Sequence, residues 1–304
     1  MSYVQGIGTL AAGVALGVLA TSTYFRLWDG RTLSNDSALL RFSPDLSTQI
    51  IRRLDPNFAV CYDRRTRIPL WTIEHLTRQT ITMGKNVDRG NSIFREDNHI
   101  HPFFRSTNQD YFGSGFDRGH LIPCADHRSS QESMNNTFFL SNIAPQVGKG
   151  FNRDKWAHLE RYARALVKHY TGGLWILTGP LYLSRLDPTD NKLYVKYQVI
   201  GSNQVAVPTH FFKVIIGQRN DNQLDIYSYL IPNEPIDNAI PLDEFLVAPE
   251  LIEQNAGFLI TTEKVHKNKI HAINQPWIDF KLQSPPSSSH QKSLPAPSSS
   301  PSTA

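Results

Sequence analysis

Residues 152–177 read NRDKWAHLERYARALVKHYTGGLWIL, and this stretch contains the patterns of both a helix and a strand. The apolar residues of its first part are Trp156, Leu159, Tyr162, Ala163, Leu166, Val167 and Tyr170. Their spacings of three and four are typical of an amphipathic helix with one buried face. The last four residues form a short apolar run that ends before Gly179-Pro180, as a buried strand does. The stretch therefore predicts a helix over 152–170 and then a core strand over 174–177.

Further apolar runs on both sides of this stretch predict more strands. Residues 138–140 form a short aromatic and aliphatic run, and residues 224–231 form a longer one. Residues 196–200 and 205–216 flank Gly201-Ser202-Asn203, a turn sequence that joins two strands of a hairpin. These runs together predict a multi-stranded and largely antiparallel sheet.

A second helix is expected near the C-terminal end of the folded region. Residues 249–256 begin with proline, which suits the first turn of a helix, and Gly257 follows as a residue that can end it. Helix and strand patterns are thus mixed along the chain. They predict the α+β class, with a mixed, largely antiparallel central sheet flanked by helices.

The composition predicts where the folded part begins and ends. With 40% hydrophobic and 19% charged residues, the 304-residue chain has enough apolar surface for one main domain. Residues 1–26 carry no charge before Arg26, so we expect a membrane anchor or a removed targeting segment there. Residues 27–56 are expected to be a linker, and residues 57–281 the main domain. Residues 282–304 are rich in Ser and Pro and are expected to be a disordered tail.

Charge and cysteine content exclude several classes of protein. Lys and Arg number 31 against 27 Asp and Glu, and the formal net charge of +4 permits a polyanionic partner without identifying one. Two cysteines cannot form a disulfide framework or a four-thiolate zinc site. The chain also has no G-x-S-x-G sequence and no phosphate-binding P-loop sequence. Because the chain has so few cysteines, a metal ion in this protein must be bound through oxygen or imidazole ligands.

The sequence Asp117-Arg118-Gly119-His120 carries the residues best suited to chemistry. Arginine can hold a phosphate through two parallel hydrogen bonds, and histidine can accept a proton near neutral pH. On an extended strand, Arg118 and His120 point to the same face because side chains alternate. The pair therefore suits the hydrolysis of a phosphodiester. The alternative is that Arg118 is a surface cation and His120 a hydrogen-bonded core histidine.

Two residues of the predicted helix over 152–170 give this motif a context. In a helix, Asn152 and Glu160 are about 80° apart around the axis and about 12 Å apart along it, so both can border one cleft. The carbonyl oxygen of asparagine is a hard ligand of the kind that Mg²⁺ accepts. The alternative for Asn152 is that it only caps the start of the helix.

Five ordered motifs connect the chain with a known family. They are Ser114–His120, Asn136–Asn142 with Ala144–Gln146, Gly150–Asp154, Thr178–Tyr182 and Val207–Lys213. With these motifs the chain resembles the ββα-metal, DNA/RNA non-specific endonucleases, and among them the mitochondrial endonuclease G group with its fungal members. The resemblance covers at least Tyr62 to about Gly257. After His120, however, this chain lacks the alanine-rich run that animal members often have.

The resemblance implies roles for three residues at the reacting centre. His120 is the general base that activates water. Asn152 is the direct protein ligand of a hydrated Mg²⁺ or Mn²⁺ ion, and Glu160 holds a water molecule of that ion.

The resemblance also implies three supporting residues. Arg118 and Asn142 match positions that support the substrate or the arrangement of the active site. Arg89 matches an arginine that stabilises the transition state, although loop lengths vary in this part of the family.

The activity implied by the resemblance is that of a metal-dependent, sugar-non-specific endonuclease. Such an enzyme hydrolyses DNA and RNA and leaves 5′-phosphate and 3′-hydroxyl ends. The implied setting is a homodimer at the mitochondrial inner membrane or in the intermembrane space, tethered by the N-terminal segment and active in mitochondrial DNA turnover or programmed cell death. Two alternatives stay open: a catalytically inactive, membrane-tethered nucleic-acid-binding protein, and an exonuclease-like paralogue.

Overall fold

The computed structural model describes residues 47–260 and 270–273, and all structural statements below concern these residues. Contacts divide the chain into two units, Met1–Ser47 and Thr48–Ala304, and the elements described here belong to the second. The predicted anchor over 1–26 and the predicted tail over 282–304 lie outside the described residues. Within the described ranges, no helix has both the length and the apolar character needed to cross a membrane.

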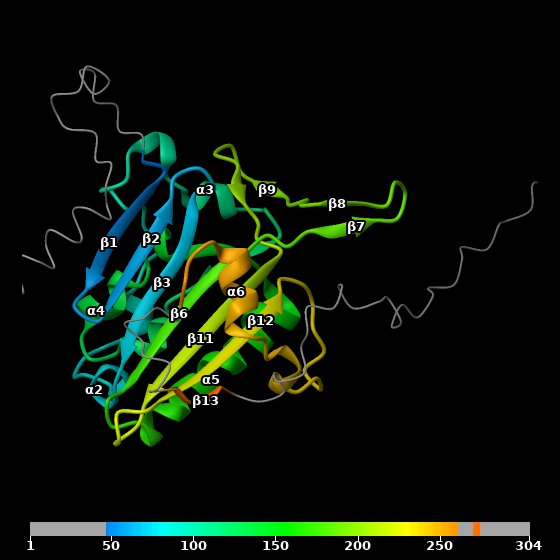
Figure 1. The fold of residues 1–304 in the computed structure, drawn as a ribbon. Coiled ribbons are helices and arrows are strands. Elements are labelled where there is room, and N and C mark those ends of the chain that lie inside the picture. The colour runs from blue at the N-terminus through cyan, green and yellow to red at the C-terminus, as the bar shows by residue number, and fades with distance from the viewer. Residues whose placement is uncertain (1–46, 261–269, 274–304) are drawn as a thin grey trace, which may run out of the picture. The chain divides into compact units, whose positions relative to one another are not determined.

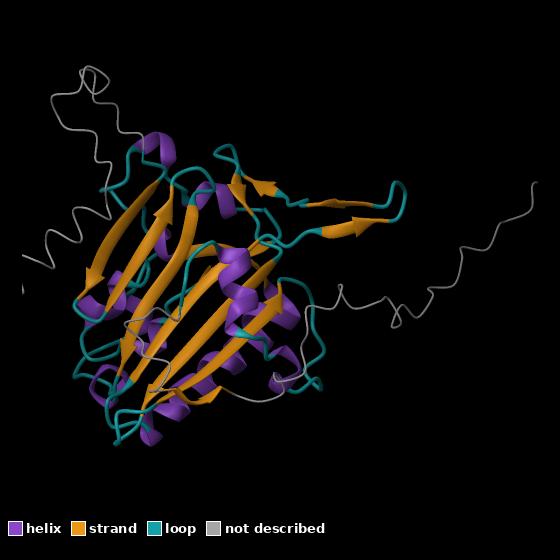
Figure 2. Cartoon of the chain, in the orientation of Figure 1, coloured by secondary structure: helices purple, strands orange, loops and turns teal. Residues whose placement is uncertain are grey.

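The core of the fold is a seven-stranded sheet with the strand order β1-β2-β3-β6-β11-β12-β13 (Figure 1). Neighbouring strands are antiparallel except β12 and β13, which are parallel. This sheet and the short helices around it confirm the predicted α+β class (Figure 2). The strands are β1 (Gln49–Asp55), β2 (Phe58–Asp63), β3 (Ile68–Leu76), β6 (Leu174–Leu181), β11 (His210–Gln218), β12 (Leu224–Pro232) and β13 (Ile270–Ile273).

The first strand lies inside residues 27–56, the segment predicted to be a linker. β1 pairs with β2 in a register that places Gln49 opposite Asp63. Most of its residues alternate between exposed and half-buried, because an edge strand turns one side toward the core and the other toward solvent. The sheet therefore begins before residue 57, the predicted start of the domain.

The two faces of the sheet pack against different helices. The helices are α2 (Arg78–Ile81), α3 (Asn108–Tyr111), α4 (Gln131–Asn136), α5 (Ala157–Leu166) and α6 (Pro249–Ala256). Phe211 of β11 belongs to an apolar cluster with Leu159 of α5, whereas the next residue, Phe212, belongs to a cluster with Ile252 of α6. Successive side chains of a strand point to opposite faces, so α5 and α6 cover opposite faces of the sheet (Figure 1).

The predicted helices are confirmed, with differences at both ends of the first, because α5 ends at Leu166 and a 3-10 turn over Val167–His169 follows it. α6 has the predicted bounds, and Gly257 follows it with a left-handed φ of 76°. In place of a helix that begins at Asn152, a π-helical segment Gly148–Trp156 precedes α5 and contains a kink at Gly150, where φ is 87°. A β-carbon at Gly150 would lie 2.8 Å from the backbone of Pro235, so both the conformation and the close contact require glycine.

The apolar run over 138–140 is not a strand, contrary to the prediction. Phe139 forms a single bridge with Arg95, and the residues after it make a 3-10 turn. Phe138, Phe139 and Leu140 pack against three different apolar clusters. A strand can direct its side chains to only two faces, so this segment crosses between clusters instead of joining the sheet.

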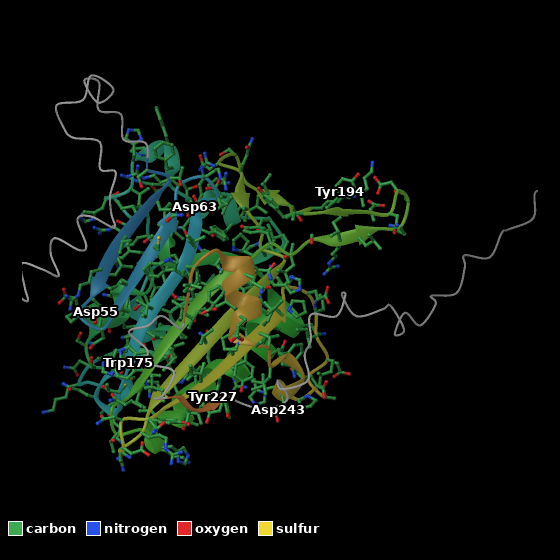
Figure 3. All side chains as sticks on the ribbon, in the orientation of Figure 1. Asp55, Asp63, Trp175, Tyr194, Tyr227 and Asp243 are labelled. Atoms are coloured by element: carbon green, nitrogen blue, oxygen red, sulfur yellow. The ribbon has the colours of Figure 1, made fainter. Side chains whose placement is uncertain are left out.

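The prediction of one hairpin over 196–216 is only partly correct. The small two-stranded sheets are β4 (Phe116–His120) with β5 (Ile143–Val147), β7 (Arg185–Asp187) with β8 (Lys192–Tyr194), and β9 (Val199–Ile200) with β10 (Val205–Ala206). β9 and β10 pair across the predicted turn, but the long strand β11 begins only at His210 and pairs with β6 and β12. Pro208 separates the two strands because it has no N–H for a ladder. The β7–β8 hairpin, which carries Tyr194, projects away from the main sheet (Figure 3).

Candidate active site

The DRGH motif lies on the first of two paired strands that lead into a helix. β4 ends at His120 and pairs antiparallel with β5, with His120 opposite Ile143. The chain then continues through the π-helical segment into α5. Gly119 faces Gln146 of β5, and a β-carbon at Gly119 would lie only 2.1 Å from that side chain. Glycine is therefore needed between Arg118 and His120 for the two strands to pair closely.

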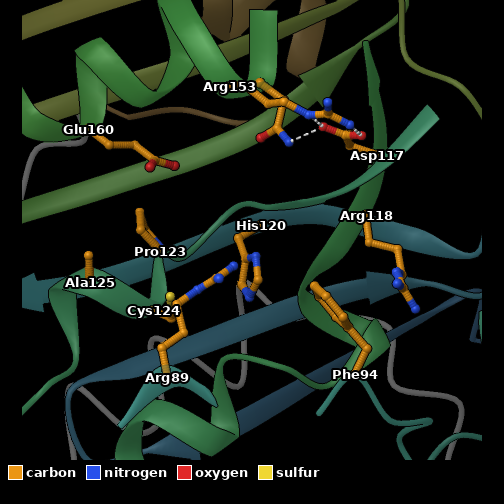
Figure 4. A pocket seen from close by; sticks show the side chains of 11 residues that line it. Arg89, Phe94, Asp117, Arg118, His120, Pro123, Cys124, Ala125, Arg153 and Glu160 are labelled. Atoms are coloured by element: carbon orange, nitrogen blue, oxygen red, sulfur yellow. Dashed lines mark hydrogen bonds and ion pairs between the residues drawn. The ribbon is translucent and has the colours of Figure 1, made fainter. Parts of the chain in front are cut away.

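A cavity of about 380 Å³ opens beside this strand pair and brings the motif and the helix together (Figure 4). Its lining residues are Arg89, Phe94, Asp117, Arg118, His120, Pro123, Cys124, Ala125, Asn152, Arg153 and Glu160. Five of the six residues selected from the sequence thus border one space, although they are up to 71 positions apart in the chain (89 to 160). Asn142 does not line this cavity.

The imidazole of His120 is held by aromatic rings. Its ring centroid is 4.7 Å from that of Phe138, in an edge-on contact, and 5.2 Å from that of Phe94. Its Nε2 atom is buried and has no hydrogen-bond partner in the described part of the chain, which leaves Nδ1 as the ring nitrogen for the cavity. Burial lowers the pKa of His120 to about 3, and the positive charge of Arg89 contributes to this shift. His120 is therefore neutral near pH 7, as a proton acceptor must be.

Two arginines flank His120, and each lies over an aromatic ring. The guanidinium of Arg89 is 5.8 Å from the ring centroid of Phe138, and that of Arg118 is 4.5 Å from the ring centroid of Phe94. Arg118 also donates a hydrogen bond of 2.7 Å to Oδ1 of Asn108. Figure 4 shows Arg89 pointing toward His120 and Cys124. Arginines held in this way can contact phosphate oxygens on either side of the histidine.

Asn142 supports the site from within the protein. Its side chain is buried and accepts a hydrogen bond from the backbone N–H of Ile122 at 3.1 Å. Its amide nitrogen donates to the carbonyl oxygens of Ile122 and Thr137, at 3.0 Å and 2.8 Å. Asn142 therefore fixes the turn that follows His120, and its role in supporting the active site stays a prediction.

The carboxamide of Asn152 contacts the motif directly. Its Nδ2 atom donates a hydrogen bond of 2.9 Å to Oδ2 of Asp117 (Figure 4). Arg153 donates to both carboxylate oxygens of Asp117, at 2.7 Å and 2.5 Å. These hydrogen bonds, chiefly those from Arg153, lower the pKa of Asp117. Asn152 lies inside the segment Gly148–Trp156 and not at its start, so it is not the residue that caps the helix. Sequence reasoning gave no role to Asp117 or Arg153, although both are direct neighbours of selected residues.

Glu160 lines the cavity and lies close to several buried charged groups. Burial raises the pKa of Glu160 to about 8, while the charge of Lys213 opposes the rise and the carboxylate of Asp126 adds to it. The surrounding pairs are His127 with Glu74 at 2.9 Å, Arg164 with Asp126 at 2.5 Å, and Lys213 with Thr178 at 2.8 Å. A carboxyl group in such a place binds a proton readily unless a cation is close to it.

We expect the change Glu160→Gln to stabilise the fold at alkaline pH in the presence of EDTA. The folded state holds the Glu160 proton until about pH 8, whereas the unfolded chain releases it near its ordinary pKa of 4.5. The stability that the protonated group contributes is therefore present below pH 4.5 and is lost as pH rises toward 8. Glutamine avoids this loss, and each kcal/mol gained raises the Tm by roughly 2–4 °C in a domain of this size.

The measurement for this variant is thermal unfolding from pH 5 to pH 9, with Glu253→Gln on the far helix α6 as the control. The Tm difference between Glu160→Gln and the wild type should increase with pH and level off above pH 8. An equal difference at all pH values would mean that ionisation of Glu160 does not oppose folding.

The residues at the cavity fit a largely hydrated divalent cation. In the part of the chain that the structure describes, no group of three or more His, Cys, Asp or Glu residues could hold a metal ion. The cavity instead offers the carboxamide oxygen of Asn152, whose nitrogen is occupied by Asp117, and the carboxylate of Glu160. Mg²⁺ keeps several waters and takes only one or two protein oxygens in many sites. Asn152 and Glu160 are therefore suitable donors for Mg²⁺ or Mn²⁺.

Comparisons with known proteins identify the family of the chain. The sequence profile of the DNA/RNA non-specific endonuclease family matches residues 35–267. Mitochondrial endonuclease G of Homo sapiens is 49% identical over 203 residues, which are 67% of this chain and 67% of that protein. The mitochondrial nuclease of Saccharomyces cerevisiae is 47% identical over 222 residues, 71% of this chain and 67% of that protein.

A solved structure supports the same relationship at the level of the fold. A crystal structure of the EndoG/EndoGI complex, which describes how EndoG is inhibited, superposes on this chain with a TM-score of 0.70. The sequence identity is 46%. The superposition covers 73% of this chain and 89% of the compared chain. Fold, motifs and sequence identity agree, and the chain is a nuclease that belongs to the DNA/RNA non-specific endonuclease family.

Proposed function

We propose that this nuclease is a divalent-metal-dependent, sugar-non-specific endonuclease. It hydrolyses phosphodiesters of DNA and RNA and leaves 5′-phosphate and 3′-hydroxyl ends. The observation that carries the proposal is the cavity that combines a neutral histidine, His120, with an available carboxamide oxygen on Asn152. One side chain can accept a proton from water while the other holds a cation near the phosphate.

In this mechanism, His120 takes a proton from the water molecule that attacks the phosphorus. The aromatic contacts of the imidazole ring hold it in place for this step. Arg89 and Arg118 bind non-bridging phosphate oxygens and oppose the negative charge that grows in the transition state. Asn152 and Glu160 would hold Mg²⁺ or Mn²⁺, which supplies Lewis-acid stabilisation of the charge on the phosphate and the departing 3′ oxygen.

The same residues explain why sequence specificity should be low. Arg89 and Arg118 address phosphates, and contacts to phosphates carry no direct sequence information. None of the roles above requires or excludes a 2′-hydroxyl group. We therefore propose that both DNA and RNA are substrates.

The proposed setting is the mitochondrion, with the enzyme at the inner membrane or in the intermembrane space. The names of the human and yeast relatives, both mitochondrial, support the mitochondrion as the location. The uncharged, apolar residues 1–25 support a membrane tether. Within this setting, we propose a homodimer that acts in mitochondrial DNA turnover or in programmed cell death.

A plasmid-nicking assay with the purified protein tests the catalytic proposal. With Mg²⁺ or Mn²⁺, supercoiled DNA should become nicked and single-stranded RNA should be degraded, and EDTA should stop both reactions. End-labelling should detect 5′-phosphate and 3′-hydroxyl ends. DNA binding without cleavage would instead identify an inactive binding protein, and cleavage of linear but not circular DNA would identify an exonuclease.

A further inference from the structure

We propose that Asp117 and Arg153 form a clamp that orients the carboxamide of Asn152, so that its oxygen rather than its nitrogen faces the cation. Asp117 is then a positioning residue for metal binding, and Arg153 positions Asp117. This inference rests on the metal-dependent function proposed above. It assigns a purpose to two cavity residues, neither of which takes part in the proposed chemistry.

The first step of the argument is the chemistry of the amide group. The two ends of a carboxamide are almost equal in size, but only the oxygen can bind a cation, because the NH₂ group is a donor. Rotation by half a turn would therefore replace a ligand by a group that repels the ion. An ionised carboxylate only accepts hydrogen bonds, so the 2.9 Å contact with Oδ2 of Asp117 selects the orientation in which Nδ2 points to Asp117.

The second step is the way in which Asp117 itself is held. Nε of Arg153 lies 2.7 Å from Oδ2 of Asp117, and a terminal nitrogen of Arg153 lies 2.5 Å from Oδ1. Two parallel hydrogen bonds fix the plane of the carboxylate as well as its position. The clamp is packed closely, because a β-carbon at Gly148 would lie 3.1 Å from Asp117 and 3.2 Å from Arg153.

The third step is the exposure of the clamp. The side chain of Arg153 is 69% exposed, and ion pairs with such exposure contribute little to stability. The ion pair between Arg153 and Asp117 should therefore contribute little to holding β4 against the helical segment. The geometry of this pair, in contrast, is well suited to hold the Asp117 carboxylate in place, so that it accepts the hydrogen bond from the Asn152 amide. The clamp should therefore affect metal affinity much more than it affects the Tm.

The test compares Mn²⁺ binding by the full-length protein and its variants, measured by electron paramagnetic resonance of free Mn²⁺, together with the Tm of each. For Asp117→Ala we expect an affinity 10- to 100-fold below wild type, the usual effect of removing a group that orients a metal ligand. Asp117→Asn can also donate a hydrogen bond to the oxygen of Asn152, so it loses the selection of orientation and should bind Mn²⁺ less tightly than the wild type. Arg153→Ala keeps the acceptor and should lie between Asp117→Ala and the wild type.

Asp187→Ala on the β7–β8 hairpin is the matched control, because it removes a carboxylate–cation pair of 2.6 Å with Lys196, which follows the hairpin. It should bind Mn²⁺ as the wild type does. Raising Mg²⁺ should restore DNA cleavage by Asp117→Ala, since the variant retains His120 and both arginines. A protein damaged in its fold would not recover in this way, so recovery supports a positioning role.

Two results would separate the failure of the clamp from the failure of the proposed function. If Asn152→Ala loses Mn²⁺ binding but Asp117→Ala and Arg153→Ala stay within twofold of wild type, the clamp is wrong and the metal site stands. If Asn152→Ala binds Mn²⁺ as wild type does, the metal site itself is wrong and the clamp fails with it. Should Asp117→Ala not fold, loss of affinity in Arg153→Ala supports the clamp, and its absence overturns it.

Discussion

Replacing His120 with alanine is expected to reduce the rate of plasmid nicking by roughly 10²- to 10⁴-fold, the usual contribution of a positioned general base. His120 is the histidine that lines the cavity, and its lowered pKa keeps the imidazole unprotonated at pH 7. The alanine variant keeps both arginines and the metal-binding residues. It should therefore still bind DNA, and the loss should fall on the single-turnover rate at saturating Mg²⁺.

His158→Ala is the control for this experiment, because His158 is an exposed histidine on α5, two residues from Glu160. This control should nick DNA at the wild-type rate. If His120→Ala and His158→Ala were equally active, another group would have to be the base, and the mechanism proposed here would be wrong.

For Asn152→Ala, the second large effect, we expect the Mg²⁺-supported rate to fall by about 10²- to 10⁴-fold. The metal ion contributes several kcal/mol of charge stabilisation, and each 1.36 kcal/mol corresponds to a factor of ten in rate. Asn152 brings the direct oxygen ligand to the cavity, and alanine has no donor atom to replace it. The rate of the variant should be measured over a wide range of Mg²⁺ concentration.

Asn255→Ala on the far helix α6 is the matched control, since its side chain is exposed and, among the described residues, donates a hydrogen bond only to the carbonyl oxygen of Leu251. It should have the wild-type rate and the wild-type Mg²⁺ dependence. A variant at Asn152 with an unchanged Mg²⁺ dependence would place the metal elsewhere, even if the overall rate were lower.

Local patterns in the sequence were sufficient to predict the helices and strands that are regular and have clear start or stop residues. β12 and α6 were predicted almost residue by residue, because a long apolar run and a Pro–Gly pair are local signals. For Asp117 to His120 the sequence only raised the possibility of an extended strand, and the structure has a strand over Phe116–His120. The run over 138–140 was predicted wrongly because its three side chains enter three clusters, and that division depends on residues far away in the chain.

The candidate site was likewise predicted only in part from the sequence. The types of residue that suit phosphodiester chemistry were identified from the sequence, and five of the six selected residues line one cavity. The hydrogen bonds by which Asn142 holds the turn after His120 could not be predicted from the sequence, because they depend on the path of the loop in space. The contact between Asp117 and Asn152 joins positions 35 apart and was missed for the same reason.

By itself, the sequence determined the chemical groups, the alternation that gives Arg118 and His120 the same side of a strand, and the family to which the chain belongs. These properties are encoded in residue types and short spacings. Only the tertiary structure decided that Asn152 points its nitrogen at Asp117, and that burial leaves His120 neutral while Glu160 holds its proton up to about pH 8. Orientation and pKa depend on what surrounds a group in space, and distant segments of the chain supply those surroundings.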